Sequence, residues 1–173
     1  EYRTHIQDIG WENDWKRNDE LSGTSHQSKR LEAIQIRLTG QIAEEYDIYY
    51  RVHAQNFGWM GWAKNGEEAG TAGYAYRLEA IQVKLVKKTD GFADYGKEYA
   101  FYDSSYDAIP TTPGAKPSTT TSTNDNYIKY TTHVQKVGWQ DYVYGGQMAG
   151  TEGMVRRVLR IITCHTPRIA DMH

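Results

Sequence analysis

One stretch of strand-like sequence occurs twice almost without change, and a third, more divergent copy follows. In the first copy apolar residues alternate with polar or charged ones, so that Ile34, Ile36 and Leu38 share one face of the segment. Alternation over six to eight residues predicts a half-buried β-strand. The three stretches are Leu31-Glu32-Ala33-Ile34-Gln35-Ile36-Arg37-Leu38, Leu78-Glu79-Ala80-Ile81-Gln82-Val83-Lys84-Leu85 and Arg157-Val158-Leu159-Arg160-Ile161-Ile162.

A longer repeat surrounds these stretches. Every copy contains a Tyr/His/Gln frame, a Gly-Trp pair, a second aromatic residue, a Gly-Thr pair and an Arg seven residues after that Gly. Agreement at so many fixed offsets indicates three structural units. The Gly-Trp pairs are Gly10-Trp11, Gly58-Trp59 and Gly138-Trp139, and the Gly-Thr pairs are Gly23-Thr24, Gly70-Thr71 and Gly150-Thr151.

The spacing of the Gly-Trp pairs locates an insertion. Trp59 follows Trp11 by 48 residues, whereas Trp139 follows Trp59 by 80. We therefore predict one domain, with repeat one at 1–45, repeat two at 46–87, an insertion and linker at 88–125, repeat three at 126–166 and a tail at 167–173. Residues 110–123 have linker composition, rich in Pro, Thr and Ser. Residues 92–106 are rich in aromatic side chains, so we expect them to pack against the body.

The composition favours strands over helices. The 173 residues include fourteen Tyr and sixteen Thr but only six Leu, and aromatic and β-branched side chains suit a pleated, half-buried surface. Three units of this size cannot bury separate cores, so they should pack around a common centre. The sequence predicts an all-β, three-repeat, pseudo-threefold architecture that is β-prism-like, with a β-trefoil as the alternative.

Several classes of protein are disfavoured. A net charge of −2 provides no footprint for nucleic acid, whose binding requires phosphate neutralisation. No apolar run approaches the ~20 residues of a membrane-spanning helix, so no membrane insertion is expected. The single cysteine, Cys164, cannot form an internal disulfide or a structural zinc site. The chain starts at Glu1 without Met, as a mature product or an excised fragment would.

The second aromatic residue of each repeat is the candidate ligand contact. Trp15 follows Asp14 and Tyr142 follows Asp141, whereas Trp62 follows a glycine. A flat ring beside a carboxylate suits a sugar, whose C–H face stacks on the ring while its hydroxyl groups bond the carboxylate. The alternative is that these rings only cover the edges of the sheets.

Other recurring residues are assigned to the framework. We expect Trp11, Trp59 and Trp139 to be core anchors, because a buried aromatic ring removes a large apolar area from water. Glu32 and Glu79 lie on the apolar side of their strands, and burial there requires a partner, either Arg30 or Arg77 or backbone donors.

His5, His53 and His133 occupy equivalent positions, and we expect structural hydrogen bonding rather than metal binding. No cofactor and no enzymatic activity are predicted. Two Glu that recur by repetition do not form an acid/base pair in separated environments.

The repeat resembles a known family. The string Tyr-Arg-Xaa-His-Xaa-Gln-Xaa-Xaa-Gly-Trp, then an aromatic residue, Gly-Thr and Arg-Leu-Glu-Ala-Ile-Gln, is similar to the clostridial hydrophobic repeat with tryptophan (ChW repeat). The resemblance is specific in the first two copies and weaker in the third. It implies a secreted or cell-surface module of Gram-positive bacteria that functions in attachment or carbohydrate binding.

Two functions therefore remain open at the level of sequence. The first is a non-catalytic, lectin-like module that binds carbohydrate or cell-wall polysaccharide through one shallow site per repeat, with avidity from repetition. The second is a protein–protein interaction or assembly module that contacts another surface protein. Tyr is an effective contact residue in such interfaces, and the candidates are Tyr74, Tyr76, Tyr95 and Tyr99.

Overall fold

The computed structural model describes residues 1–107, 125–151 and 158–164, excluding the side chains of 125–127, 159, 160 and 162–164. The described residues form fifteen strands and one four-residue helix, which confirms the all-β prediction. The linker at 110–123 and the tail lie outside the described residues.

Each repeat contributes two long strands and several short ones. Repeat one holds β1 (Tyr2–Ile6), β2 (Gly10–Trp11), β3 (Ser22–Gly23) and β4 (Leu31–Ile36), and the helix α1 (Ile42–Glu45) leads on to repeat two. Repeat two holds β5 (Tyr46–Ala54), β6 (Gly58–Trp59), β7 (Ala63–Lys64), β8 (Ala69–Ala72) and β9 (Leu78–Lys87). After β10 (Phe101–Asp103) in the insertion, repeat three holds β11 (Asp125–Val134), β12 (Gly138–Trp139), β13 (Val143–Gly145), β14 (Met148–Gly150) and β15 (Val158–Cys164).

The two long strands of each repeat pair antiparallel in an equivalent register. Thr4 lies opposite Ile34 in β1 and β4, Val52 opposite Ile81 in β5 and β9, and Thr132 opposite Ile161 in β11 and β15. The register shifts immediately after the repeat histidine in all three pairs. The sequence repeat is therefore a repeat of backbone geometry.

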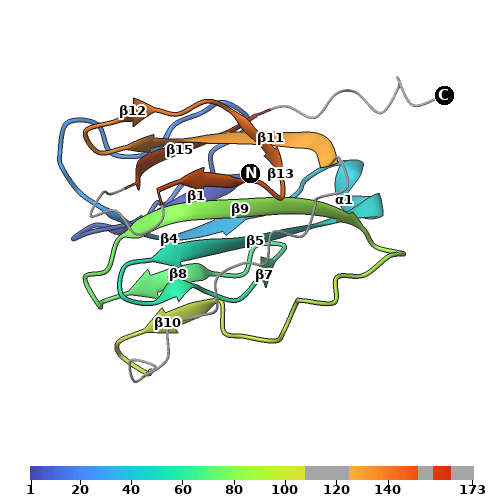
Figure 1. The fold of residues 1–173 in the computed structure, drawn as a ribbon, viewed down its shortest axis with the longest axis horizontal. Helices are drawn as coiled ribbons and strands as arrows, with labels where there is room; N and C mark the ends of the chain where they lie inside the picture. Colours follow the sequence, from blue (N-terminus) through green and yellow to red (C-terminus); the bar gives the residue numbers. More distant parts are fainter. Residues whose placement is uncertain (108–124, 152–157, 165–173) are drawn as a thin grey trace.

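The strand that carries the glycine of each Gly-Thr pair joins the sheet of another repeat. β8 of repeat two pairs with β4, β14 of repeat three pairs with β9, and β3 of repeat one pairs with β15. The result is three five-stranded sheets, each built around one repeat's long pair and completed by a neighbour. Figure 1 shows β11, β12 and β15 at the top and β8 and β10 at the bottom. The separate sheets, linked in a cycle, correspond to the predicted prism-like architecture rather than to the β-trefoil alternative.

Glycine is required where the exchanged strand meets its neighbour. Gly70 has a φ of +124°, and a Cβ there would collide with the carbonyl oxygen of Glu32. Gly150 has the same φ, and its Cβ would collide with the carbonyl oxygen of Glu79. The Gly of the Gly-Thr pair thus permits a close approach of two backbones that a side chain would prevent.

The core lies where the three long strand pairs meet. Equivalent side chains from all three repeats surround a cavity of about 10 Å³ at this centre, among them Leu31, Ile34, Leu78, Ile81, Val158 and Ile161. Apolar walls around so small a space leave no partners for a water molecule.

The repeat tyrosines Tyr2, Tyr50 and Tyr130 are fully buried. Each hydroxyl donates a hydrogen bond to the carbonyl three residues before the glycine of its own Gly-Thr pair. These carbonyls belong to Glu20, Glu67 and Gln147. Burial raises the pKa of Tyr50 well above its ordinary value.

Residues 88–107, the described part of the insertion, are termed the insertion segment. Its strand β10 runs parallel to β8 and extends the first sheet. Phe92 contacts Tyr49, with ring centroids 4.9 Å apart, and Tyr102 contacts Phe57 at 5.1 Å. The expected packing against the body is therefore present, although Tyr99 and Tyr106 remain 78 % and 88 % exposed.

Candidate functional site

The Gly-Trp pair forms a tight hairpin that places the tryptophan beside the repeat histidine. The backbone takes a positive φ at Gly10, Gly58 and Gly138, a conformation that glycine adopts without steric cost. As a result the paired residues are His5 and Trp11, His53 and Trp59, and His133 and Trp139. Their rings meet edge to face, with centroids 5.4, 5.5 and 5.3 Å apart.

The three tryptophans differ in exposure. Trp59 is 1 % exposed and Trp11 is half-buried, but Trp139 is 42 % exposed. The expectation of a core anchor therefore describes Trp59 well and has to be corrected for Trp139. The physical reason is that the insertion segment packs over the sheet of repeat two, whereas no described element covers Trp139 to the same extent.

Glu32 and Glu79 lie in two nearly identical clusters. Glu32 receives a hydrogen bond of 2.8 Å from Arg30 Nε and lies 3.1 Å from His5 Nδ1. Glu79 receives one of 2.9 Å from Arg77 and lies 3.1 Å from His53 Nδ1. Both carboxylates are buried, as expected for charges that have internal partners.

The second aromatic residue of every repeat stacks on a cation. Trp15 lies 3.9 Å from the Arg37 guanidinium and 4.8 Å from that of Arg3. Trp62 lies 4.6 Å from Arg51, and Tyr142 lies 4.7 Å from Lys129 Nζ. Such contacts contribute about 0.5–1 kcal/mol at exposed sites. The exposed side chains of Asp14 and Asp141 lie beside the rings in sequence.

Sequence reasoning missed these cations. The available signal was the Arg inside the Tyr-Arg-Xaa-His frame of repeats one and two, which lies two residues before the histidine and so on the same face of the strand. Glutamines of the neighbouring strand fix both side chains: Arg3 Nε donates to Gln35 and Arg51 Nε to Gln82, each at 2.7 Å. Burial lowers the pKa of Arg51, and the nearby Asp94 and Glu98 oppose that shift.

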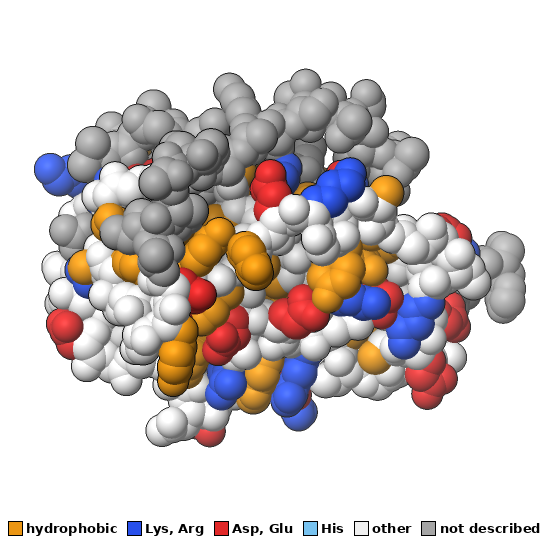
Figure 2. All heavy atoms as spheres, turned by 90° about the horizontal axis from the view of Figure 1, so that it is seen from below, with side chains coloured by type: hydrophobic (Ala, Val, Ile, Leu, Met, Phe, Trp, Pro, Cys, Tyr) orange, Lys and Arg blue, Asp and Glu red, His pale blue; other side chains and the backbone are white. Residues whose placement is uncertain are grey.

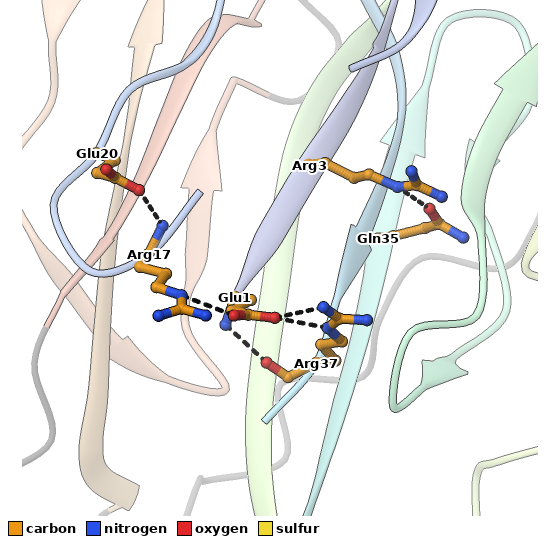
Figure 3. Close-up of polar contacts among 6 residues, drawn as sticks. All are labelled: Glu1, Arg3, Arg17, Glu20, Gln35 and Arg37. Atoms are coloured by element: carbon orange, nitrogen blue, oxygen red, sulfur yellow. Dashed lines mark hydrogen bonds and ion pairs between the residues drawn. The ribbon is translucent and has the colours of Figure 1, made fainter. Parts of the chain in front are cut away.

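Arg37 of repeat one also belongs to an ion-pair cluster around Glu1, which Figure 3 shows. The Glu1 carboxylate receives hydrogen bonds of 2.7 Å from both Arg17 Nε and Arg37 Nε. The hydrogen bond from Arg37 is the main cause that holds the pKa of Glu1 below its ordinary value. The cluster positions Arg37 under Trp15.

In repeat two the corresponding ring is covered. Trp62 is 8 % exposed, and Phe92 of the insertion segment meets it edge to face at 5.0 Å. Stacking of a sugar needs an accessible ring face, so Trp62 does not fit the predicted role of a ligand contact.

Figure 2 shows the molecule from the side on which β10 lies, with hydrophobic, acidic and basic side chains interspersed.

The residue that follows the Gly-Trp pair is a hydrogen-bond acceptor in repeats one and three but not in repeat two. In repeat one Glu12 accepts hydrogen bonds from Thr4 and from the backbone N–H of Gly23. In repeat three Gln140 accepts them from Thr132 Oγ1 and the N–H of Gly150.

Repeat two has the apolar Met60 at this position. There the N–H of Gly70 instead donates to the carbonyl of Ala100, at 2.8 Å. The insertion segment thus supplies the acceptor that Met60 lacks.

The described residues contain no group of three or more His, Cys, Asp and Glu side chains arranged to hold a metal ion. The three repeat histidines each contact the tryptophan of their own repeat. Within the same part of the chain, no helix is both long and apolar enough to cross a membrane.

A family comparison matches all three repeats. The model of the ChW family, "Clostridial hydrophobic W", matches residues 5–40, 53–87 and 133–159, together more than half of the chain. The chain belongs to the ChW family. Each matched segment begins at the repeat histidine, so the ChW unit coincides with the structural repeat. The ChW repeat is a module of cell-surface type. No curated protein and no solved structure matches the chain.

Proposed function

We propose that this ChW chain is a secreted or cell-surface module of a Gram-positive bacterium that binds carbohydrate or cell-wall glycan. One observation carries the proposal: repeats one and three leave an aromatic ring accessible eight residues before the glycine of the Gly-Thr pair, beside an exposed aspartate. Tyr142 is 42 % exposed and Trp15 is half-buried. A ring of this kind binds the C–H face of a sugar, while the adjoining Asp141 or Asp14 accepts hydrogen bonds from its hydroxyl groups.

Two shallow sites on one rigid body suit a repetitive polymer. Each site alone supplies a small contact area, but binding at one site raises the effective concentration of polymer at the other. The cations below the rings, Arg3 and Arg37 in repeat one and Lys129 in repeat three, hold the rings in place through cation–π contacts. This supports a module whose affinity for single sugars is low and whose retention on a polymer is high.

The proposal contains no catalytic step. Glu32 and Glu79 have the same partners in their two clusters, an Arg and a His each. Acid/base catalysis by two carboxylates depends on environments that push their pKa values apart. An activity that Glu79→Gln abolishes in the folded protein would contradict this part of the proposal.

Retention on purified Gram-positive peptidoglycan sacculi tests the function. We expect the wild-type chain to be retained and Trp15→Ala or Tyr142→Ala to weaken binding about two- to tenfold each, as the loss of one aromatic contact implies. The double variant should lose most retention. Tyr144→Ala is the matched control, because Tyr144 is 46 % exposed in the same repeat and has no part in the proposed sites. A folded double variant that binds like the wild type would remove the rings from the mechanism.

A second candidate function, binding of a protein partner, is favoured by the packing of the insertion segment. Its aromatic side chains already cover a repeat, and its exposed Tyr99 lies next to Tyr102, with ring centroids 5.8 Å apart. Tyr74 and Tyr76 stack nearby at 5.9 Å, and both contact Phe57. Saturable binding to a surface protein that Tyr99→Ala abolishes, with no response of tryptophan fluorescence to sugars, would favour this candidate.

A further inference from the structure

We infer that the insertion segment is a built-in occupant of the ligand face of repeat two, which leaves the module with two open faces and one closed face. The inference rests on the proposed function for the identity of the ligand. The closed face consists of Arg51, Trp59 and Trp62 together with the edge of β8 that pairs with β10. Its equivalents in repeats one and three are the faces around Trp15 and Tyr142.

The closed face has the same construction as the open ones. The guanidinium of Arg51 lies 4.6 Å from Trp62, against 4.8 Å between Arg3 and Trp15 and 4.7 Å between Lys129 and Tyr142. The ring and its cation are therefore present in repeat two, although Gly61 replaces the aspartate that precedes the ring in repeats one and three. The face also differs in accessibility, because Trp59 is 1 % and Trp62 8 % exposed.

The side chains of the insertion segment meet this face through rings and charges. Phe92 contacts Trp62 and Tyr49, and Lys84 Nζ lies 5.1 Å from the Phe92 ring. The Tyr95 hydroxyl donates a hydrogen bond of 2.6 Å to Glu67. Asp94 and Glu98 lie near enough to Arg51 to favour its charged form. An aromatic, acidic segment thus fills a face made of aromatic and cationic groups.

The backbone of the insertion segment fits repeat two specifically. The N–H of Gly61 donates to the carbonyl of Tyr99 at 2.9 Å, and a Cβ at Gly61 would collide with the carbonyl oxygen of Glu98. Repeat three has Asp141 at the position of Gly61. A side chain is therefore compatible with the fold at this position but not with the insertion segment in its observed place.

Gly61→Ala tests the inference with a single methyl group. The background is the Trp15→Ala/Tyr142→Ala variant, in which both open faces have lost their rings. We expect oxidation of Trp62 by N-bromosuccinimide, mapped by mass spectrometry, to become about fivefold faster as local opening increases. Retention on peptidoglycan sacculi should rise about threefold above the background, though below the wild type, because a single face lacks avidity.

Tyr106→Ala in the same background is the matched control. It removes an 88 % exposed ring from the same segment, and we expect neither readout to change. Phe92→Ala provides a second route, because it removes the ring that covers Trp62 without a substitution in the repeat. It should reproduce both effects of Gly61→Ala if opening of the face is their cause.

The outcomes separate the inference from the proposed function. Faster oxidation of Trp62 without a gain in retention, while the wild type binds sacculi, would overturn the closed ligand face alone. Unchanged oxidation of Trp62 in both Gly61→Ala and Phe92→Ala would overturn the covering role of the insertion segment. A wild-type chain that does not bind sacculi would instead overturn the proposed function.

Discussion

Repeats two and three share one sequence pattern but present opposite surfaces. Trp59 and Trp62 are 1 % and 8 % exposed, whereas Trp139 and Tyr142 are each 42 % exposed. The difference arises outside the shared pattern, in the insertion segment and in the residues that receive it, Met60 and Gly61. A recurring aromatic residue thus reveals the geometry of a repeat, but the neighbouring chain decides whether the ring faces a ligand or the interior.

Trp59 and Trp139, the equivalent tryptophans of repeats two and three, test this comparison most strongly. We expect Trp59→Ala to lower the free energy of unfolding by about 3–5 kcal/mol, because it leaves a cavity in place of a fully buried indole ring. Trp139→Ala should cost about 1 kcal/mol, because its ring is already partly solvated. Urea denaturation of both variants gives the two values. Equal losses would show that exposure does not distinguish the repeats energetically.

The pairing of β8 of repeat two with β4 of repeat one should provide the next largest change in stability. Gly70→Ala should destabilise the protein by about 3 kcal/mol, since it combines a strained φ with a collision against the backbone of repeat one. Gly96→Ala is the control. Gly96 has a φ of +78° but open space around its Cβ position, so we expect about 1 kcal/mol there. Thermal unfolding of the two variants checks the difference, and similar melting temperatures would contradict the role of the close approach.

The residue after the tryptophan sharpens the comparison between repeats one and two. Glu12→Met should cost about 2 kcal/mol, because Thr4 and the N–H of Gly23 lose their acceptor. The Thr4 and Ser22 hydroxyl groups both donate to Glu12. Adding Thr4→Val and Ser22→Ala, which copies Val52 and Ala69 of repeat two, should therefore recover part of that loss. Denaturant unfolding of single, double and triple variants measures the coupling. Strict additivity of the three substitutions would contradict it.

The ion pair of Asp47 with Lys64, 2.8 Å apart, gives the smallest effect. Burial opposes ionisation of Asp47, but hydrogen bonds from Lys64 and Asn65 outweigh it, so its pKa lies below the ordinary value. The pair therefore stabilises the folded state above the unfolded pKa, and this contribution is lost as pH falls through the lower, folded pKa. Asp47→Asn should cost about 1 kcal/mol or less at pH 7. Its difference from the wild type in unfolding free energy should shrink below about pH 4, and a constant difference would contradict the assignment.

The sequence was sufficient for the framework because the framework repeats. The alternation in residues 31–38 and 78–85 predicted β4 and β9, and the shared offsets predicted three equivalent units. The pairing of Glu32 with Arg30 followed from the cost of burying a lone carboxylate. Exchange of the Gly-Thr strands was not predicted, because one sequence does not say which neighbouring strand a short edge strand will join.

The site was less predictable because it depends on contacts between segments. Trp62 looked like its counterparts in sequence, yet the chain folds Phe92 onto it from thirty residues away. The cations beneath the rings were missed because Arg3 and Arg51 reach their partners across the sheet. The glycine that precedes Trp62 was the visible exception to the acid–aromatic pattern, and it proved to be the point where the insertion segment approaches.

The cyclic pairing of strands has a consequence for how the chain acquires its structure. β3 is synthesised early but pairs with β15, the last described strand. The sheet that contains β3 therefore stays incomplete until nearly all of the polypeptide is present. Such long-range closure slows folding. A polypeptide with two units would leave an exchanged strand without a partner, whereas three close the cycle. Stability in longer arrays of this unit should therefore increase in steps of three.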